Sequence, residues 1–97
     1  MAEGPEWRSP ESLEDHFRRH GAEVGARDEA DYLRLARETV RLGREFTYRR
    51  TGSLRFGYYH ARTKRFVAIN PATREFLSLS RRSENYVRTL RDSTYRK

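Results

Sequence analysis

The chain of 97 residues contains no cysteine, which excludes disulfides and thiolate metal sites. No hydrophobic run approaches the roughly 20 residues that a membrane-spanning helix requires, and no signal-peptide pattern is present, so we expect a soluble protein that does not associate with a membrane. Walker and nucleophile-elbow patterns are also absent. Their absence argues against the enzyme classes that depend on them.

Lysine is scarce, because only two of the 21 basic residues are lysine and the others are arginine. The net charge of +7 is unevenly distributed: residues 1–31 carry nine acids against four arginines, and residues 32–97 carry a net charge of +12. A GC-rich genome is an alternative explanation for the arginine-to-lysine ratio, but it does not explain the excess charge. Since arginine favours bidentate phosphate contacts, the basic part predicts a polyanion or an acidic protein as partner.

Hydrophobic spacing predicts two helices in the first half of the chain. The first is expected to begin at Ser9-Pro10 and to end near Gly21. The second fits residues 28–42, between the N-cap Asp28 and Gly43. Residues 1–8 are expected to form a flexible N-terminus, and residues 9–97 a single domain.

Alternating hydrophobic residues predict four strands after Gly43, in "REFTYRR", "SLRFGYYHA", "KRFVAIN" and "REFLSLSR". A short C-terminal helix is expected to begin near Ser83. The sequence therefore predicts an α+β fold, in which two N-terminal helices pack on a roughly four-stranded antiparallel sheet. In the last strand we expect Leu77 and Leu79 to face the helices. The other side chains of that strand should form an open face: Phe76, Ser78 and Ser80.

The first helix places His16 and His20 one turn apart on its apolar stripe. Metal-free RNA cleavage needs a base for the ribose 2′-OH, an acid for the leaving oxygen and cations around the phosphorus, and histidine and arginine supply these groups. Ser78 is a candidate hydrogen-bond donor. The candidates for base stacking or phosphate contact are Tyr58, Tyr59, Phe76, Arg81 and Arg82.

The alternative interpretation of each candidate is structural. A histidine in an apolar stripe more often packs than catalyses, and the arginines by default are solvated charge. A zinc site at His16 and His20 is not favoured, because the residues between them, "FRR", supply no carboxylate. We expect no metal and no cofactor.

The order of residues resembles a known family. The string "LEDHFRRHGAEVGARDEADYLRLA" is similar to the N-terminal signature of small toxin nucleases in the barnase–EndoU–colicin–RelE-like superfamily. "RFVAIN" resembles the aromatic start of a strand in that family. "FLSLSRRSENY" resembles its ending, with Ser78 in the hydroxyl position and Tyr86 as the tyrosine of the last helix. The resemblance covers roughly residues 12–90 and departs in two places: the hydroxyl residue is usually threonine, and "NPATRE" lacks the usual Asp-Gly turn.

This resemblance implies a metal-independent endoribonuclease toxin used in bacterial competition. Such a toxin cleaves tRNA in the bacterial cytoplasm, in some cases after delivery by secretion or cell contact, and is neutralised by an immunity protein that we expect to be acidic. On this interpretation His20 is the general base or acid and His16 supports it. Arg65, with Arg81 or Arg82, stabilises the charge on phosphorus, Ser78 donates a hydrogen bond, and Tyr86 either packs or positions the phosphate. Two alternatives stay open: a nucleic-acid-binding module without chemistry, and a protein-interaction domain.

Overall fold

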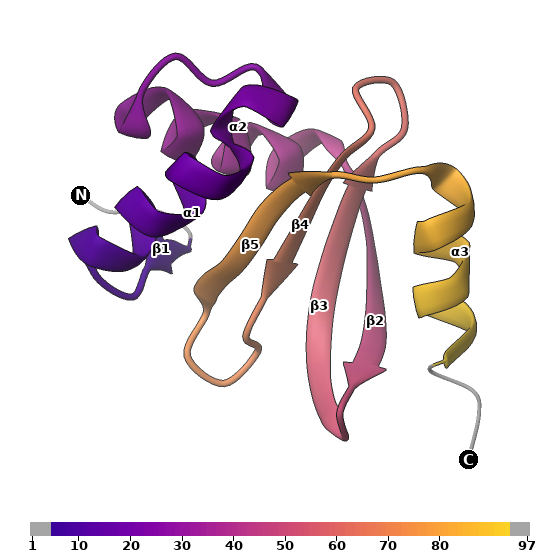
Figure 1. The fold of residues 1–97 in the computed structure, drawn as a ribbon. Coiled ribbons are helices and arrows are strands. Elements are labelled where there is room, and N and C mark those ends of the chain that lie inside the picture. Colours follow the sequence, from indigo (N-terminus) through magenta and orange to yellow (C-terminus); the bar gives the residue numbers. More distant parts are fainter. Residues whose placement is uncertain (1–4, 94–97) are drawn as a thin grey trace.

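The computed structural model describes residues 5–93, in which helices and strands follow one another in blocks (Figure 1). A short strand, β1 (Glu6–Trp7), is followed by the helices α1 (Pro10–Val24) and α2 (Glu29–Leu42). Four strands come next, and the helix α3 (Glu84–Ser93) ends the described part. The four strands are β2 (Arg44–Arg50), β3 (Ser53–His60), β4 (Arg65–Ile69) and β5 (Glu75–Arg81). The predicted α+β architecture is confirmed.

The sheet is mixed, with five strands in the order β1-β5-β4-β3-β2. Strands β2 to β5 form the predicted antiparallel meander. The addition is β1, which lies in the segment expected to be a flexible N-terminus and pairs in parallel with β5, so that Trp7 lies opposite Phe76. This segment is ordered because Trp7 is buried: it is 8% exposed and packs in the larger of two hydrophobic cores, the main core, together with Tyr32 and Leu79. A strand of two residues is too short to produce an alternating pattern in the sequence.

The first helix begins where the sequence predicts and ends later. The Ser9 hydroxyl accepts a hydrogen bond of 3.1 Å from the Ser12 N–H, as expected of an N-cap. Gly21 does not end the helix. It is buried within α1, and a Cβ there would lie 2.5 Å from Cδ1 of Phe17, so the missing side chain makes room for that ring. The helix ends at Gly25, which adopts a left-handed conformation with φ of 83°.

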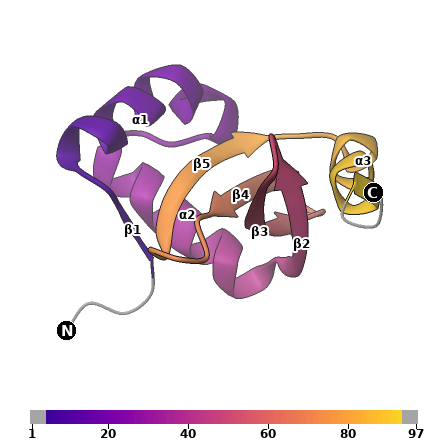
Figure 2. The same cartoon turned by 90° about the horizontal axis from the view of Figure 1, so that it is seen from below.

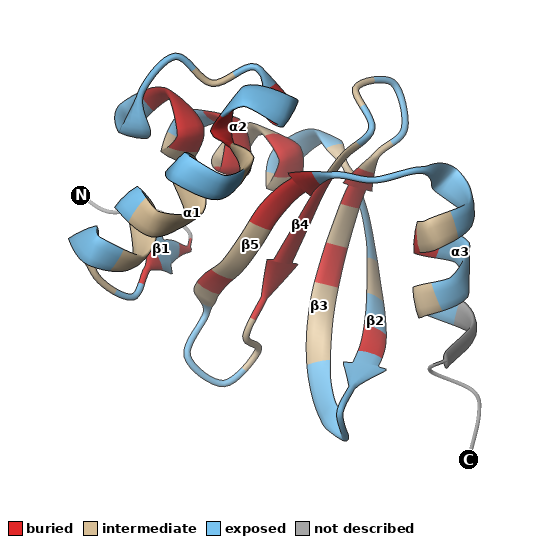
Figure 3. Cartoon of the chain, in the orientation of Figure 1, coloured by how far each residue is buried: buried red, intermediate tan, exposed pale blue. Residues whose placement is uncertain are grey.

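The helix α2 covers one face of the sheet, with Tyr32, Leu35 and Ala36 in the same core as Val67 and Leu79. The Tyr32 hydroxyl donates a hydrogen bond of 2.5 Å to the Leu79 carbonyl and so fixes α2 against β5. Figure 3 shows that buried residues concentrate in α2 and in β4 and β5.

The other face of the sheet carries a smaller core beside α3. Its buried members are Tyr48, Tyr59, Phe66, Ala68 and Val87. Figure 2 shows α1 beside β5 and α3 at the far end of the sheet, where it contacts β2. None of the helices in residues 5–93 covers the part of this face between α1 and α3.

The strand β5 contains an irregularity that corrects its predicted faces. Ala68 pairs with Ser78, but Ile69 pairs with Phe76, so Leu77 is an extra residue. As a result Phe76 joins the core under α2, while Leu77 packs with the smaller core on the opposite face. The prediction that Leu77 and Leu79 share a face, with Phe76 opposite them, is therefore wrong. Strict alternation cannot reveal a bulge.

Candidate active site

A cavity of about 200 Å³ lies between α1, the open sheet face and the start of α3. We call it the histidine cavity. It brings together five residues that the sequence indicated as candidates. These are His16, His20, Ser78, Arg82 and Tyr86. Its other lining residues are Arg19, Tyr48, Arg50, Arg55, Phe66, Leu77 and Ser80.

The orientation of His16 follows from one hydrogen bond. Its Nδ1 lies 2.9 Å from the Ser12 carbonyl oxygen. Because a carbonyl oxygen only accepts, Nδ1 must carry the hydrogen, and a neutral His16 therefore has its free lone pair on Nε2. The ring also packs against Trp7, with the two ring centroids 4.8 Å apart. The helix and β1 thus fix both the position and the tautomer of this imidazole.

His20 lies one turn further along α1, with its ring centroid 6.5 Å from that of His16 in a stacked arrangement. Its Nδ1 is 3.2 Å from Oε2 of Glu23, an ion-pair distance whose angle does not meet hydrogen-bond geometry, and Nδ1 is shielded from solvent. The same Glu23 oxygen accepts a 2.9 Å hydrogen bond from the Arg81 N–H. Glu23 therefore joins His20 to the end of β5.

A second group of contacts forms the wall of the cavity beside α3. Ser78 is half-buried, whereas Ser80 is 1% exposed and accepts a 3.1 Å hydrogen bond from Nε of Arg82. The Arg82 guanidinium lies 4.8 Å from the centroid of the Tyr86 ring, within the range of a cation–π contact. Arg82 is therefore held on two sides while it remains exposed.

Sequence reasoning missed three residues of the cavity floor and Glu23. Tyr48 and Arg50 come from β2, and Arg55 from β3. Burial raises the pKa of the Tyr48 hydroxyl, and the Arg55 side chain acts in the opposite direction. These side chains reach the cavity because Tyr48 pairs with Arg55 across β2 and β3. This register is not visible in the sequence. Glu23 had a signal, since it lies three residues after His20, but the expected helix ended too early to use it.

Arg65 does not line the histidine cavity, which corrects the prediction that it stabilises charge there. Its Nε and Nη2 donate hydrogen bonds of 3.1 and 2.9 Å to the Val24 carbonyl, and its Nη1 lies 3.8 Å from Glu38. The guanidinium is used to satisfy the C-terminal end of α1, where cations are favourable.

The aromatic candidates for base stacking are also in other places. Phe76 is 3% exposed in the main core, so it has no free face for a base. Tyr58 packs against that same core, on the α2 side of the sheet. Tyr59 is 8% exposed and donates a 2.9 Å hydrogen bond to the Arg82 carbonyl. Arg81 contributes its backbone N–H to Glu23, and its exposed side chain does not line the cavity.

Charge pairing differs between the two parts of the molecule. Arginines of α1, α2 and their connection form ion pairs, among them Arg18, Arg27 and Arg37. In contrast, Arg65 is the only cation between residues 41 and 91 with an ion pair among the described residues. The histidine cavity is lined by Arg50, Arg55 and Arg82, which form no ion pair with a described residue. We call them the uncompensated arginines, and their charges produce a positive potential in the cavity.

Within residues 5–93, no cluster of three or more His, Asp or Glu side chains is arranged to hold a metal ion. None of the helices in that range is both long enough and apolar enough to cross a bilayer. Comparison of the chain with models of known families, with curated proteins and with solved structures gives no match.

Proposed function

We propose that the chain is a metal-independent endoribonuclease that cleaves RNA by acid–base transesterification at the histidine cavity. The observation that supports this most is the shared cavity of two imidazoles, a serine hydroxyl and uncompensated arginines. These are the groups that the reaction needs: proton carriers, a hydrogen-bond donor and cations near the phosphorus.

In the proposed reaction one imidazole removes the proton of the ribose 2′-OH, and the 2′ oxygen attacks the adjacent phosphorus. The bond from phosphorus to the 5′ oxygen breaks, and a protonated group supplies the proton for that oxygen. The products are a 2′,3′-cyclic phosphate and a free 5′-OH. We assign one proton transfer to His20, whose ring is held beside Glu23, and the other to His16 through Nε2.

The remaining roles are electrostatic and positional. Arg82, with Arg50 and Arg55, takes the role that was expected of Arg65 and stabilises the charge that grows on the phosphoryl oxygens. Ser78 donates a hydrogen bond to the same group, and Tyr86 supports Arg82 through its ring face.

The resemblance to toxin nucleases suggests the substrate and the partner. We propose tRNA as the RNA, bacterial cytoplasm as the place of action and competition between bacteria as the purpose. An acidic immunity protein would then cover the uncompensated arginines, because opposite charges favour rapid association.

A nucleic-acid-binding module without chemistry is the second candidate. It is favoured by exposed arginines of the sheet that form no ion pair with a described residue, among them Arg49 and Arg50, because such cations can bind phosphates whether or not cleavage follows. Cleavage distinguishes the two candidates.

The test is incubation of the purified protein with total tRNA in EDTA. We expect cleavage by the wild type and a loss of at least about 100-fold in His20→Ala, the scale of a lost general acid or base. Arg18→Ala is the matched control, since Arg18 lies on the same helix with its side chain 69% exposed. Intact tRNA at high protein concentration, or equal cleavage by His20→Ala, would contradict the proposal.

A further inference from the structure

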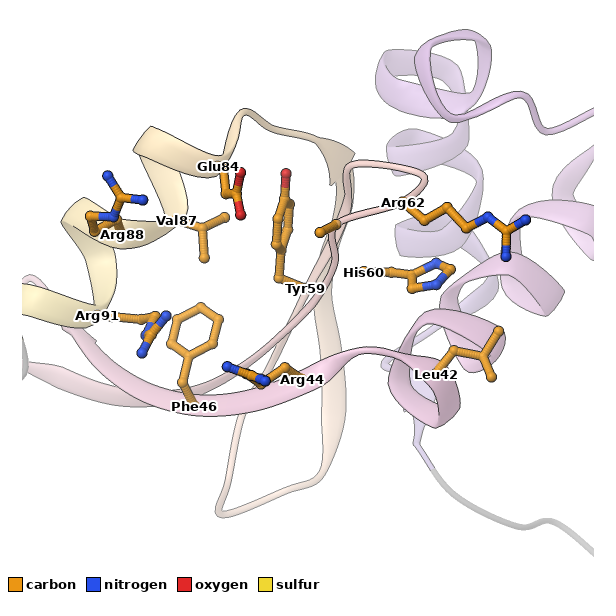
Figure 4. A pocket seen from close by; sticks show the side chains of 11 residues that line it. Leu42, Arg44, Phe46, Tyr59, His60, Arg62, Glu84, Val87, Arg88 and Arg91 are labelled. Carbon is orange, nitrogen blue, oxygen red and sulfur yellow. The ribbon is translucent and has the colours of Figure 1, made fainter.

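A second and larger cavity, of about 420 Å³, lies on the opposite side of the start of α3 (Figure 4). We call it the α3 cavity. The apolar lining in its middle consists of the half-buried ring of Phe46, which is the face open to a ligand, and the buried side chains of Tyr59 and Val87 beside it. Arg44 from β2 and Arg88 and Arg91 from α3 surround this surface, whereas Arg62 points away from α3 in Figure 4.

The arginines of the α3 cavity are available to a ligand. Arg44, Arg88 and Arg91 are exposed and form no ion pair with a described residue. Within the described part of the chain, one side-chain hydrogen bond of these three arginines is present, from Nη1 of Arg88 to Oδ1 of Asn85 at 3.3 Å. Among the described residues of the lining, Glu84 is the one carboxylate against four arginines, so these residues carry a net positive charge. An apolar middle with cations around it matches a nucleotide, whose base is flat and apolar and whose phosphate is anionic.

The two cavities are neighbours on the same face of the sheet. Tyr86 lines the histidine cavity and the next residue, Val87, lines the α3 cavity. The hydroxyl of Tyr59, in the α3 cavity, donates its hydrogen bond to the carbonyl of Arg82, whose side chain lines the histidine cavity. The start of α3 thus separates the two cavities, so a strand that leaves the histidine cavity has to cross this turn, beside the exposed Arg82, to reach the α3 cavity.

We infer that the α3 cavity binds a second nucleotide of the same single-stranded nucleic acid, beyond the phosphate at the histidine cavity. The inference rests on the proposed function, which identifies the strand as the substrate RNA. It adds that this substrate is bound as an extended single strand that reaches from the histidine cavity to the α3 cavity. Binding at Arg44, Arg88 and Arg91 is separate from the chemistry at the histidines.

The experiment measures the binding of a fluorescein-labelled ten-nucleotide DNA strand by anisotropy over a series of salt concentrations. DNA lacks the 2′-OH, so the proposed reaction cannot destroy the probe. The double variant Arg88→Gln/Arg91→Gln removes two cations of the α3 cavity. Arg18→Gln/Arg27→Gln removes the same charge from α1 and its connection to α2, where both side chains are largely exposed. Circular dichroism verifies that both variants fold.

We expect Arg88→Gln/Arg91→Gln to bind roughly tenfold more weakly, with the slope of log K against log salt smaller by about 1.4, since each phosphate contact on a single strand contributes about 0.7. The control variant should stay within about twofold of the wild type. Equal binding by the two double variants would overturn the inference. A glutamate-rich peptide that binds through Arg88 and Arg91 while DNA does not would also overturn it, in favour of a protein partner.

Failure of this inference is distinguishable from failure of the proposed function. RNA cleavage with no effect of Arg88→Gln/Arg91→Gln on DNA binding contradicts the α3 cavity and leaves the nuclease intact. Binding that depends on Arg88 and Arg91, without any cleavage of RNA, supports the α3 cavity and contradicts the nuclease.

Discussion

Nδ1 of His20 lies 3.2 Å from Oε2 of Glu23, and that same oxygen accepts a hydrogen bond from the Arg81 N–H at the end of β5. One carboxylate thus links an imidazole on α1 to the strand that carries Ser78. In the proposed reaction this link keeps the ring in position relative to the phosphate, because a third group that orients the base is a general feature of such sites.

Glu23→Gln tests this positioning role. We expect kcat for RNA cleavage to fall about tenfold while KM changes by less than about twofold, since the substrate contacts remain. Glu14→Gln is the control, because Glu14 is an exposed residue of the same helix. A change confined to KM, or an equal loss in both variants, would show that Glu23 does not position His20.

Ser78 is predicted to act through its hydroxyl. Ser78→Ala should lower kcat about tenfold, as expected for one hydrogen bond to a charged group of about 1.5 kcal/mol, and Ser78→Thr should keep the activity. Steady-state cleavage of a short RNA provides the measurement. The prediction is contradicted if Ser78→Ala cleaves as fast as the wild type.

The fold was largely predictable because it follows local signals. Ser9, Asp28 and Gly43 mark helix ends through capping, and alternation marks the four strands of the meander. Two features escaped because they depend on tertiary structure. The strand β1 exists because Trp7 has a core to enter, and the bulge at Leu77 exists because β5 must pair with β4 and also place Phe76 under α2.

The site was predictable only in part, for a related reason. His16, His20, Ser78 and Tyr86 carry a local pattern, and the structure brings them together. No local sequence pattern indicates which of the nineteen arginines line the cavity. Register decides it: pairing of β2 with β3 brings Arg50 and Arg55 to the cavity, while Arg65 is used by the end of α1.

Trp7 should stabilise the fold through β1. Trp7→Ala is expected to lower the free energy of unfolding by about 3–5 kcal/mol, the usual range for removal of a buried aromatic side chain. Trp7→Phe should cost much less, because Nε1 of Trp7 is buried without a hydrogen-bond partner and its loss removes no bond. Urea unfolding followed by circular dichroism measures both. If Trp7→Ala were as stable as the wild type, the packing of β1 would be incorrect.

Asp31 should make stability depend on acidic pH. The Arg27 N–H and then the Arg34 side chain bind its carboxylate, and they hold the pKa of Asp31 below its usual value of 3.8. Because the pKa is lower in the folded protein than in the unfolded chain, the ionised carboxylate stabilises the fold. This contribution is fully present above pH 3.8 and is lost as the pH falls through the lower pKa of the folded protein.

The corresponding variant is Asp31→Asn. We expect its melting temperature to lie several degrees below that of the wild type at pH 7 and the difference to shrink below about pH 4. Asp15→Asn is the control, because Asp15 forms only exposed pairs with Arg18 and Arg19. A difference that does not change between pH 7 and pH 3 would refute the role of the Asp31 carboxylate.

The most direct measurement of the central claim is the end-group analysis of a synthetic RNA strand after incubation with the protein in EDTA. The same strand with 2′-deoxyribose at the cut nucleotide is the comparison. Attack by the 2′ oxygen predicts a 2′,3′-cyclic phosphate on the 5′ fragment and no cut at the deoxy position. Cleavage at the deoxy position, or products that appear equally with the His16→Ala/His20→Ala variant, would contradict the proposal that the two imidazoles transfer the protons of RNA cleavage.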